Sequence, residues 1–161
     1  MHRNLSDSLP IAAPYLVWSR SAPLRVGDLG EACPPLDAAL QARQRGYAER
    51  GTCPGGVAPF LKLVAAIAGD VVTTTPKAVF VNGHALPNSG QVLSYSKGRR
   101  IVTRPYGIHR LRPGQVWLYG TNPLSFDSRK FGPVQTAAVR FVAWAPISAP
   151  LPDLKKTLGT Q

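Results

Sequence analysis

The most distinctive charge in this chain is that of Lys62, which lies within a run of about 12 mostly apolar residues, 57–68. If this run is buried, the lysine loses hydration, and its pKa falls until a neutral amine exists near neutral pH. A neutral amine can act as the general base for a serine hydroxyl. A lysine that extends to the surface from a strand edge would give the same pattern. The segment alone leaves both interpretations open.

A serine that such a base could activate is Ser8, which follows Ser6 and Asp7 and precedes Leu9 and Pro10. A hydroxyl at this position could act as a nucleophile if a base removed its proton. Serines beside polar turn-forming residues are also common as solvated turns and caps. Ser8 is therefore a candidate that its own segment does not establish.

Residues 120–132 form a polar loop with an unusual concentration of functional side chains. Asp127 and Arg129 are placed to form a charge-assisted pair that would fix the loop. Ser125 or Ser128 would then be held against a reactive group. A surface loop stabilised by Asx and Ser turns is the alternative.

The two cysteines of the chain are Cys33 and Cys53. A bond between them would close a loop of about 20 residues and contribute ~3 kcal/mol in the chain-entropy model. Two cysteines do not by themselves establish a bridge, so free thiols remain the alternative. We expect no metal site, because neither Cys-Pro-Pro nor Cys-Pro-Gly-Gly provides a second ligand at a useful spacing.

The elements that would position these groups are mostly short strands. The chain has 16 prolines and 15 glycines in 161 residues, which favours turns over long helices. One helix is predicted at 35–48, and an Asn-Gly pair at 82–83 predicts a hairpin turn. Strands are predicted at 15–18, 71–75, 78–81, 101–104, 115–119 and 137–145. The expected fold class is therefore mainly β with one helix.

The net charge of +11 bears on the partners that the protein could bind and does not predict its fold. It fits nucleic acid, an anionic membrane surface or an acidic protein. The basic residues are scattered, and no nucleic-acid-binding motif accompanies them. No stretch of about 20 apolar residues is present to span a membrane.

Taken in order, these segments resemble the type I signal peptidases, and most closely the TraF-type peptidases of conjugative transfer systems. The resemblance covers roughly residues 4–145, and one departure is Thr121, where the family usually has an aspartate. The matching segments are Ser8-Leu9-Pro10, Lys62 with the Gly69-Asp70 turn, the strand 79–81 with Asn82-Gly83, Gly120-Thr121-Asn122 with 125–129, and the two Cys-Pro motifs.

The resemblance implies a serine/lysine peptidase. Ser8 would be the nucleophile and Lys62 the general base, while the Ser8 backbone N–H and the Ser6 hydroxyl would stabilise the oxyanion. Ser125 would orient the lysine amine. The resemblance also implies a Cys33–Cys53 disulfide and no cofactor or metal. Asp127, Ser128 and Arg129 would support the loop.

The implied fold is an antiparallel, signal-peptidase-like β fold over residues 1–145. A region at about 30–56 would be inserted in it and would hold the short helix and the disulfide. Residues 146–161 are expected to form a loose, Pro-rich tail. The family has a transmembrane helix before the nucleophile, and because only seven residues precede Ser8, we expect this anchor to be absent here.

The implied substrate is a membrane-tethered preprotein, such as a pilin precursor of a conjugative transfer system. The site would face the periplasmic side of the bacterial inner membrane, with the basic surface near anionic lipid. Cleavage could be followed by pilin cyclisation, and nucleic acid is not an expected partner. Two alternatives are a self-cleaving repressor-type serine/lysine protease and a basic β-domain that binds nucleic acid without catalysis.

Overall fold

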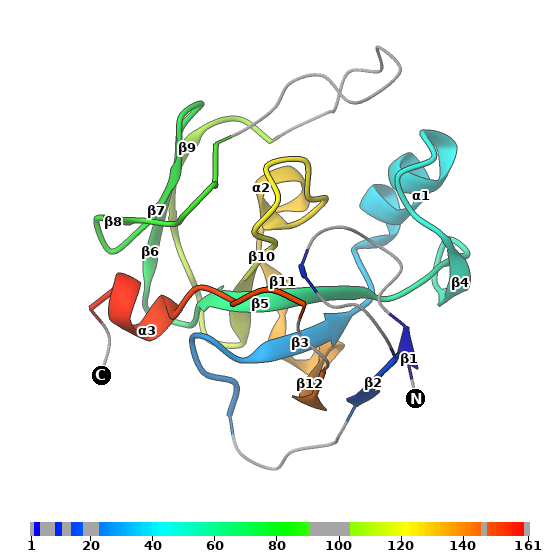
Figure 1. Ribbon diagram of the computed structural model, residues 1–161. Helices are drawn as coiled ribbons and strands as arrows, with labels where there is room; N and C mark the ends of the chain where they lie inside the picture. Colours follow the sequence, from blue (N-terminus) through cyan, green and yellow to red (C-terminus); the bar gives the residue numbers. More distant parts are fainter. Residues whose placement is uncertain are drawn as a thin grey trace.

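The computed structural model describes residues 2–3, 9–10, 14–17, 23–90, 104–145 and 148–159. Over these ranges the chain is mainly antiparallel β-structure in two sheets, which confirms the expected fold class (Figure 1). Ser6 and Ser8 lie outside the described residues, as do residues 101–103 of the strand predicted at 101–104. Within the described ranges, no helix has both the length and the apolar character that a membrane crossing requires.

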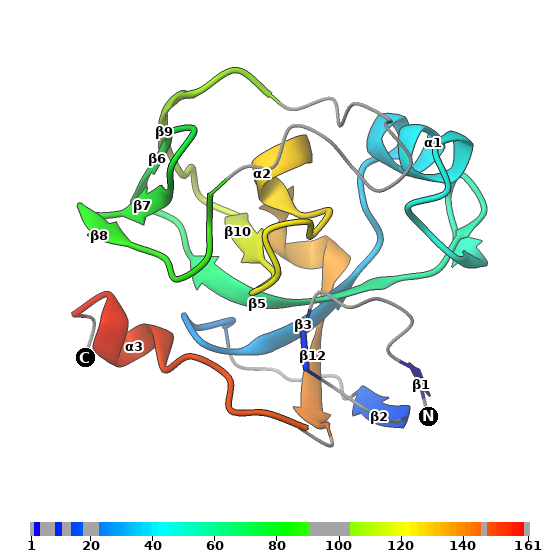
Figure 2. The ribbon, with the colours of Figure 1, turned by 45° about the horizontal axis from the view of Figure 1, so that its top comes forward.

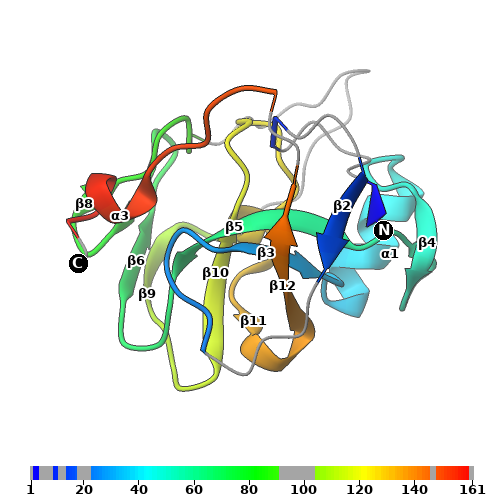
Figure 3. The same ribbon diagram turned by 60° about the horizontal axis from the view of Figure 1, so that its bottom comes forward.

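The larger sheet has the strand order β1-β2-β12-β3-β5-β10-β11, and its neighbouring strands are antiparallel. Figure 3 shows β12 crossing from β3 toward β2, close to the N-terminus. Its strands are β1 (His2–Arg3), β2 (Pro14–Val17), β3 (Leu29–Ala32), β5 (Phe60–Ala66), β10 (Gln115–Tyr119), β11 (Val134–Gln135) and β12 (Val139–Trp144). The strand β3 was not predicted, because Leu-Gly-Glu-Ala shows no alternating pattern and takes its conformation from pairing with β5 and β12.

The smaller sheet has the order β8-β7-β6-β9. It consists of β6 (Val71–Thr74), β7 (Val79–Val81), β8 (His84–Ala85) and β9 (Gly107–Arg110). The predicted Asn-Gly turn joins β7 to β8, and both Asn82 and Gly83 have positive φ, at 50° and 85°. These are the backbone angles that a two-residue type I′ hairpin requires.

The disulfide between Cys33 and Cys53 is present and fixes a small region beside the larger sheet. This region contains α1 (Leu36–Gln44) and β4 (Arg50–Cys53). The helix is shorter than the predicted 35–48, because Pro35 precedes it and Gly46, with φ of 70°, follows its end. Two further single-turn helices, α2 (Ser128–Phe131) and α3 (Leu154–Thr157), were not predicted, and a 3₁₀ turn spans Thr136–Ala138.

The two faces of β5 are covered by different parts of the molecule, and every residue of this strand is buried. Because side chains alternate along a strand, Phe60, Lys62 and Val64 share one face. Phe60 and Val64 pack with residues of α1 and α2. The opposite face belongs to the core shared with the smaller sheet and α3. Figure 2 shows α1 and α2 on one side of β5 and α3 on the other.

The C-terminal segment 148–159 packs on the body of the protein, in contrast to the loose tail expected from its composition. Leu154 and Leu158 of this segment are buried in the core shared by the two sheets. The backbone N–H and the hydroxyl of Ser148 both donate to the Pro10 carbonyl, at 2.8 and 3.0 Å. The two leucines supply the apolar surface that the expectation overlooked.

Candidate active site

Lys62 is the buried lysine that the sequence predicts. Its side chain is 1% exposed, and its Nζ lies 5.2 Å from the centroid of the Phe60 ring. A 3.3 Å hydrogen bond to the neighbouring Leu61 carbonyl provides only weak solvation. The pKa of Lys62 is lowered to about 8, chiefly by burial; the charge of Asp127 opposes this shift, and the charges of Arg129 and Lys130 contribute to it. A substantial neutral fraction is therefore present at slightly alkaline pH.

Asp127 and Arg129 form the charge-assisted pair predicted from the loop. Arg129 Nη2 lies 2.7 Å from Asp127 Oδ2, and Arg129 Nε lies 2.9 Å from Asp127 Oδ1. The carboxylate also accepts hydrogen bonds from the backbone N–H groups of Gly120 and Arg129. Burial by itself would raise the pKa of Asp127, but the charge and hydrogen bonds of Arg129 hold it below its ordinary value. Both groups of the pair are therefore charged at the pH values at which Lys62 loses its proton.

The Arg129 guanidinium connects the loop to a distant part of the chain. Its Nη2 donates to the carbonyls of Gly120 and Asn122, at 3.0 and 2.9 Å. Its Nη1 donates to the carbonyls of Asn88 and Gly90, both at 3.4 Å. One side chain thus links the loop after β10 to the segment after β8.

The two serines of this loop have different surroundings. Ser128 Oγ accepts a 2.8 Å hydrogen bond from the backbone N–H of Leu118, which attaches α2 to β10. Ser125 is buried, and its backbone N–H donates to the Asn122 carbonyl at 2.9 Å. Ser128 therefore attaches α2 to β10, whereas Ser125 is a buried residue of the segment that leads to α2.

The loop reaches the surroundings of Lys62 through aromatic side chains and charge. The Phe126 ring packs edge-on against Phe60 with 6.0 Å between centroids, and Phe60 is the ring beneath the lysine amine. The charges of Asp127 and Arg129 both act on the lysine. The structure therefore brings together two motifs that are about 60 residues apart in the sequence.

The proposed nucleophile lies outside the described residues, but the residues that follow it are described. Leu9 is buried in the core that also contains Leu61 and Leu63, the two neighbours of Lys62 in β5. The Pro10 carbonyl is held by Ser148. The chain that leaves Ser8 is therefore anchored in the same core as β5.

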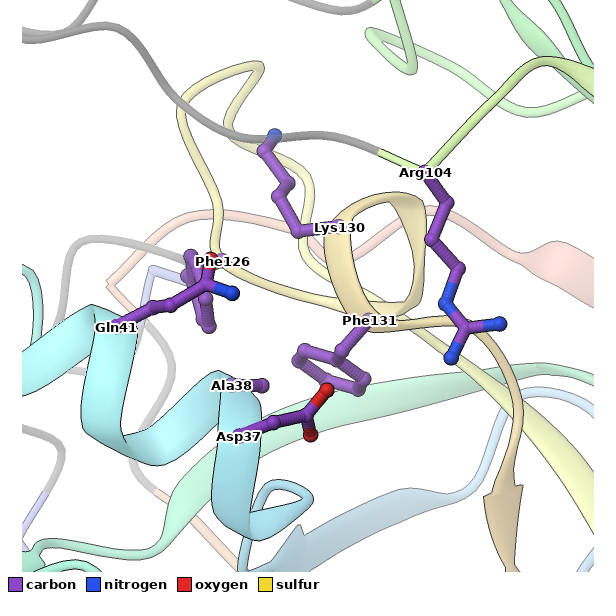
Figure 4. Close-up of a pocket in the computed structure, with 7 residues that line it drawn as sticks. All are labelled: Asp37, Ala38, Gln41, Arg104, Phe126, Lys130 and Phe131. Atoms are coloured by element: carbon purple, nitrogen blue, oxygen red, sulfur yellow. The ribbon is translucent and has the colours of Figure 1, made fainter.

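A second buried lysine, Lys130, was missed by the sequence reasoning. It is 5% exposed, its Nζ has no hydrogen-bond partner among the described residues, and burial lowers its pKa to about 8. Lys130 is one of the residues that line a cavity of about 110 Å³ between α1 and α2, and in Figure 4 its amine extends away from Asp37 and Phe131. No local pattern marks it, because it stands between Arg129 and Phe131 in a segment whose composition is that of a polar loop.

In the described ranges, no group of three or more His, Cys, Asp or Glu side chains is placed to hold a metal ion. The chemistry available is proton transfer by the buried Lys62 amine, whose pKa is influenced by the fixed Asp127–Arg129 pair.

Comparison with known proteins agrees with the chemistry of these motifs. The family model described as signal peptidase, peptidase S26, matches residues 3–146. The probable conjugal transfer protein TraF of Sinorhizobium fredii is 38% identical over 84% of this chain and 71% of its own length. The conjugal transfer protein TraF of Agrobacterium tumefaciens is 35% identical over 87% of this chain and 78% of its own.

A plasmid transfer protein TraF of Escherichia coli is 33% identical over 84% of this chain and 76% of its own length. Among solved structures, a signal peptidase I of Enterococcus faecalis covers 76% of this chain and 98% of that chain. Its TM-score is 0.42 and its sequence identity is 18%.

Proposed function

The chain belongs to the signal peptidase S26 family and is a serine peptidase, and we propose that Ser8 is its nucleophile and Lys62 its general base. The observation that supports this assignment is the buried amine of Lys62, whose pKa is lowered to about 8. A lysine that is neutral in its resting state can accept a proton, whereas a charged one cannot. Family membership also favours peptidase chemistry over nucleic-acid binding.

The proposed reaction has two steps. Ser8 Oγ attacks the scissile carbonyl while Lys62 takes its proton, and Lys62 then gives that proton to the leaving amine. The product of this step is an acyl ester on Ser8. In the second step Lys62 takes a proton from a water molecule, which attacks the ester carbonyl; the bond to Ser8 Oγ breaks, Lys62 gives the proton to that oxygen, and the acid is released. The Ser8 backbone N–H and the Ser6 hydroxyl are proposed to bind the oxyanion.

The loop after β10 is proposed to hold Lys62 in position. Ser125 would accept or donate a hydrogen bond at the lysine amine. Asp127 and Arg129 would keep the loop in place through the hydrogen bonds described above, and Ser128 would attach it to β10. These roles are supported by the burial of all four side chains.

We propose a membrane-tethered preprotein as substrate, and specifically a pilin precursor. This proposal is supported by the names of three relatives, which are conjugal or plasmid transfer proteins. Cleavage would take place at the periplasmic face of the inner membrane, and the net charge of +11 would favour a position near anionic lipid. If the amino terminus of the bound polypeptide attacked the ester in place of water, the product would be a cyclic peptide. Its mass would be one water molecule below that of the linear, hydrolysed product.

The dyad can be tested with a penem inhibitor that acylates serine, with the adduct measured by intact mass. The wild type should carry one adduct, and Ser8→Ala and Lys62→Met should carry none. Lys77→Met is a matched control, because Lys77 is an exposed lysine outside the site, and it should react like the wild type. An adduct that persists in Ser8→Ala would show that another residue is the nucleophile.

A further inference from the structure

Residues 148–159 form a strap across one side of the molecule. Ser148, at one end of the strap, is bonded to Pro10, and the other end carries α3, which lies beside β8 (Figure 3). The family model matches residues 3–146, so the strap lies outside the matched part of the chain. Membership of the family therefore assigns it no role.

The strap holds Pro10 by its carbonyl group. Proline has no backbone N–H, so the carbonyl is the one backbone group of Pro10 that can form a hydrogen bond. This oxygen accepts two hydrogen bonds from Ser148, one from the backbone N–H at 2.8 Å and one from the hydroxyl at 3.0 Å. The two residues are 138 positions apart in the sequence, so these bonds join the two ends of the chain.

The other end of the strap is fixed by apolar side chains. Leu154 and Leu158 are 1% and 3% exposed, and they belong to the core shared by the two sheets. Between Ser148 and this anchor, Pro150 and Pro152 each restrict φ to about −65° and so reduce the conformations open to the segment. The strap is therefore stiff and is attached at both ends.

The middle of the strap is separated from the loop that follows β10. Residues 149–152 form one side of a cavity of about 800 Å³, and its other sides are Leu9-Pro10, Pro87-Asn88 and residues 121–123. Because this cavity lies between them, the loop does not hold the strap in place. The position of the strap relative to Pro10 depends on the bonds of Ser148 and on the leucine anchor.

We propose that Ser148 is a positioning residue for the nucleophile, and that the strap keeps the segment that carries Ser8 in the geometry needed for attack. The inference rests on the proposed function, because it takes Ser8 as the nucleophile. Ser8 precedes Pro10 by two residues, which span at most about 7 Å, so a fixed Pro10 carbonyl limits the positions that Ser8 can take. Such limits matter, because a nucleophile misplaced by about 1 Å can react about 100-fold more slowly.

The first experiment removes one of the two hydrogen bonds. Ser148 is exposed, so Ser148→Ala should fold, and it loses the hydroxyl but keeps the backbone N–H. Its maximal rate of penem acylation should fall about three- to tenfold, the range expected for one hydrogen bond. The penem concentration that gives half the maximal rate should not change, and Ser148→Thr, which keeps both donors, should react like the wild type.

A matched control removes a hydroxyl that is bonded elsewhere. The Thr75 hydroxyl donates to the Ala78 carbonyl at 2.8 Å and accepts from the Ala78 N–H at 3.1 Å, in the connection between β6 and β7. Thr75→Val should lose stability and keep the wild-type rate of acylation. With a cleavable peptide in place of the penem, Ser148→Ala should lower kcat and leave KM unchanged.

The second experiment loosens the other end of the strap and records the pH profile. Leu154→Ala should slow acylation by the folded protein, whereas Val81→Ala, which truncates a buried residue of β7 in the same core, should reduce stability without slowing it. The anchor packs on the face of β5 opposite to Lys62. Ser148→Ala and Leu154→Ala should therefore lower the plateau rate and leave the midpoint of the pH profile where it is in the wild type.

The outcomes separate this proposal from the assignment of the dyad. A wild-type plateau rate in Ser148→Ala or in Leu154→Ala would overturn it, and so would equal slowing in Thr75→Val and Val81→Ala, because the effect would then be a general loss of stability. A shifted midpoint would also overturn it, since Ser148 would then act through Lys62. A wild type that neither reacts with penem nor cuts any peptide would contradict the proposed function, and the positioning role would fall with it.

Discussion

Arg129 Nη2 lies 2.7 Å from Asp127 Oδ2, and both side chains are fully buried. The same guanidinium group also holds the carbonyls of Gly120, Asn122, Asn88 and Gly90. This ion pair therefore organises two features at once: the loop near Lys62 and the segment after β8.

Arg129→Met should destabilise the protein strongly. The substitution would leave the Asp127 carboxylate buried without its partner, and breaking a buried pair in this way costs about 3–5 kcal/mol. The free energy of unfolding measured in urea tests this expectation. Arg112→Met removes an exposed arginine and should change the stability by no more than about 0.5 kcal/mol. Equal stability of the two variants would show that the network contributes little.

The rate of penem acylation should rise with pH through about 8 and level off above it. Lys62 must be neutral to accept the Ser8 proton, and its pKa is lowered to about 8 by burial. Measuring the rate from pH 6 to pH 10 on the wild type would locate this limb. A rate that was flat from pH 6 upward would mean that a group other than Lys62 controls the proton transfer.

Lys130→Met should move that limb to higher pH. The charge of Lys130 is one of the influences that lower the pKa of Lys62, so removing it should raise the pKa of Lys62 and reduce the neutral fraction at a given pH. The plateau rate should be unchanged, because Lys130 is not proposed to touch the substrate. Lys77→Met, which removes an exposed lysine, is the control and should leave the limb in place.

The stability of the wild type should increase with pH between about 8 and 10.5. In this window an unfolded lysine still binds a proton, whereas folded Lys62 has already lost its own, so the unfolded state binds more protons and becomes less favourable as pH rises. Lys130 acts in the same direction. The pH slope of the free energy of unfolding should be smaller in Lys62→Met and smallest in the double variant with Lys130→Met. A wild-type slope equal to that of the double variant would contradict the lowered pKa values.

Reduction of the Cys33–Cys53 bond should cost about 3 kcal/mol of stability, as expected for a loop of this length. The bond joins residues 20 apart and encloses α1 and β4. Urea unfolding with and without a reductant measures this effect, and the double variant Cys33→Ser, Cys53→Ser should be insensitive to the reductant. Equal stability of the wild type under both conditions would indicate that the loop is held by packing alone.

The sequence by itself determined the features that depend on neighbouring residues. The Asn82-Gly83 turn follows from backbone angles that this pair tolerates, and strands such as β6 and β10 follow from their β-branched and aromatic residues. The apolar run around Lys62 made burial one of two interpretations, and the position of β5 between β3 and β10 decided between them. The Asp127–Arg129 pair was also visible, since its partners are two residues apart.

Only the tertiary structure decided the contacts between distant segments. The strand β3 exists because β5 and β12 pair with it, and the C-terminal segment is packed because Leu154 and Leu158 reach a core built from both sheets. Arg129 contacts Asn88 and Gly90, about 40 residues earlier in the chain, and four separate segments line the cavity of about 800 Å³ beside Leu9. Such contacts depend on strand order and crossover, which no local pattern of side chains encodes. The burial of Lys130 and this cavity therefore became visible only in the folded chain.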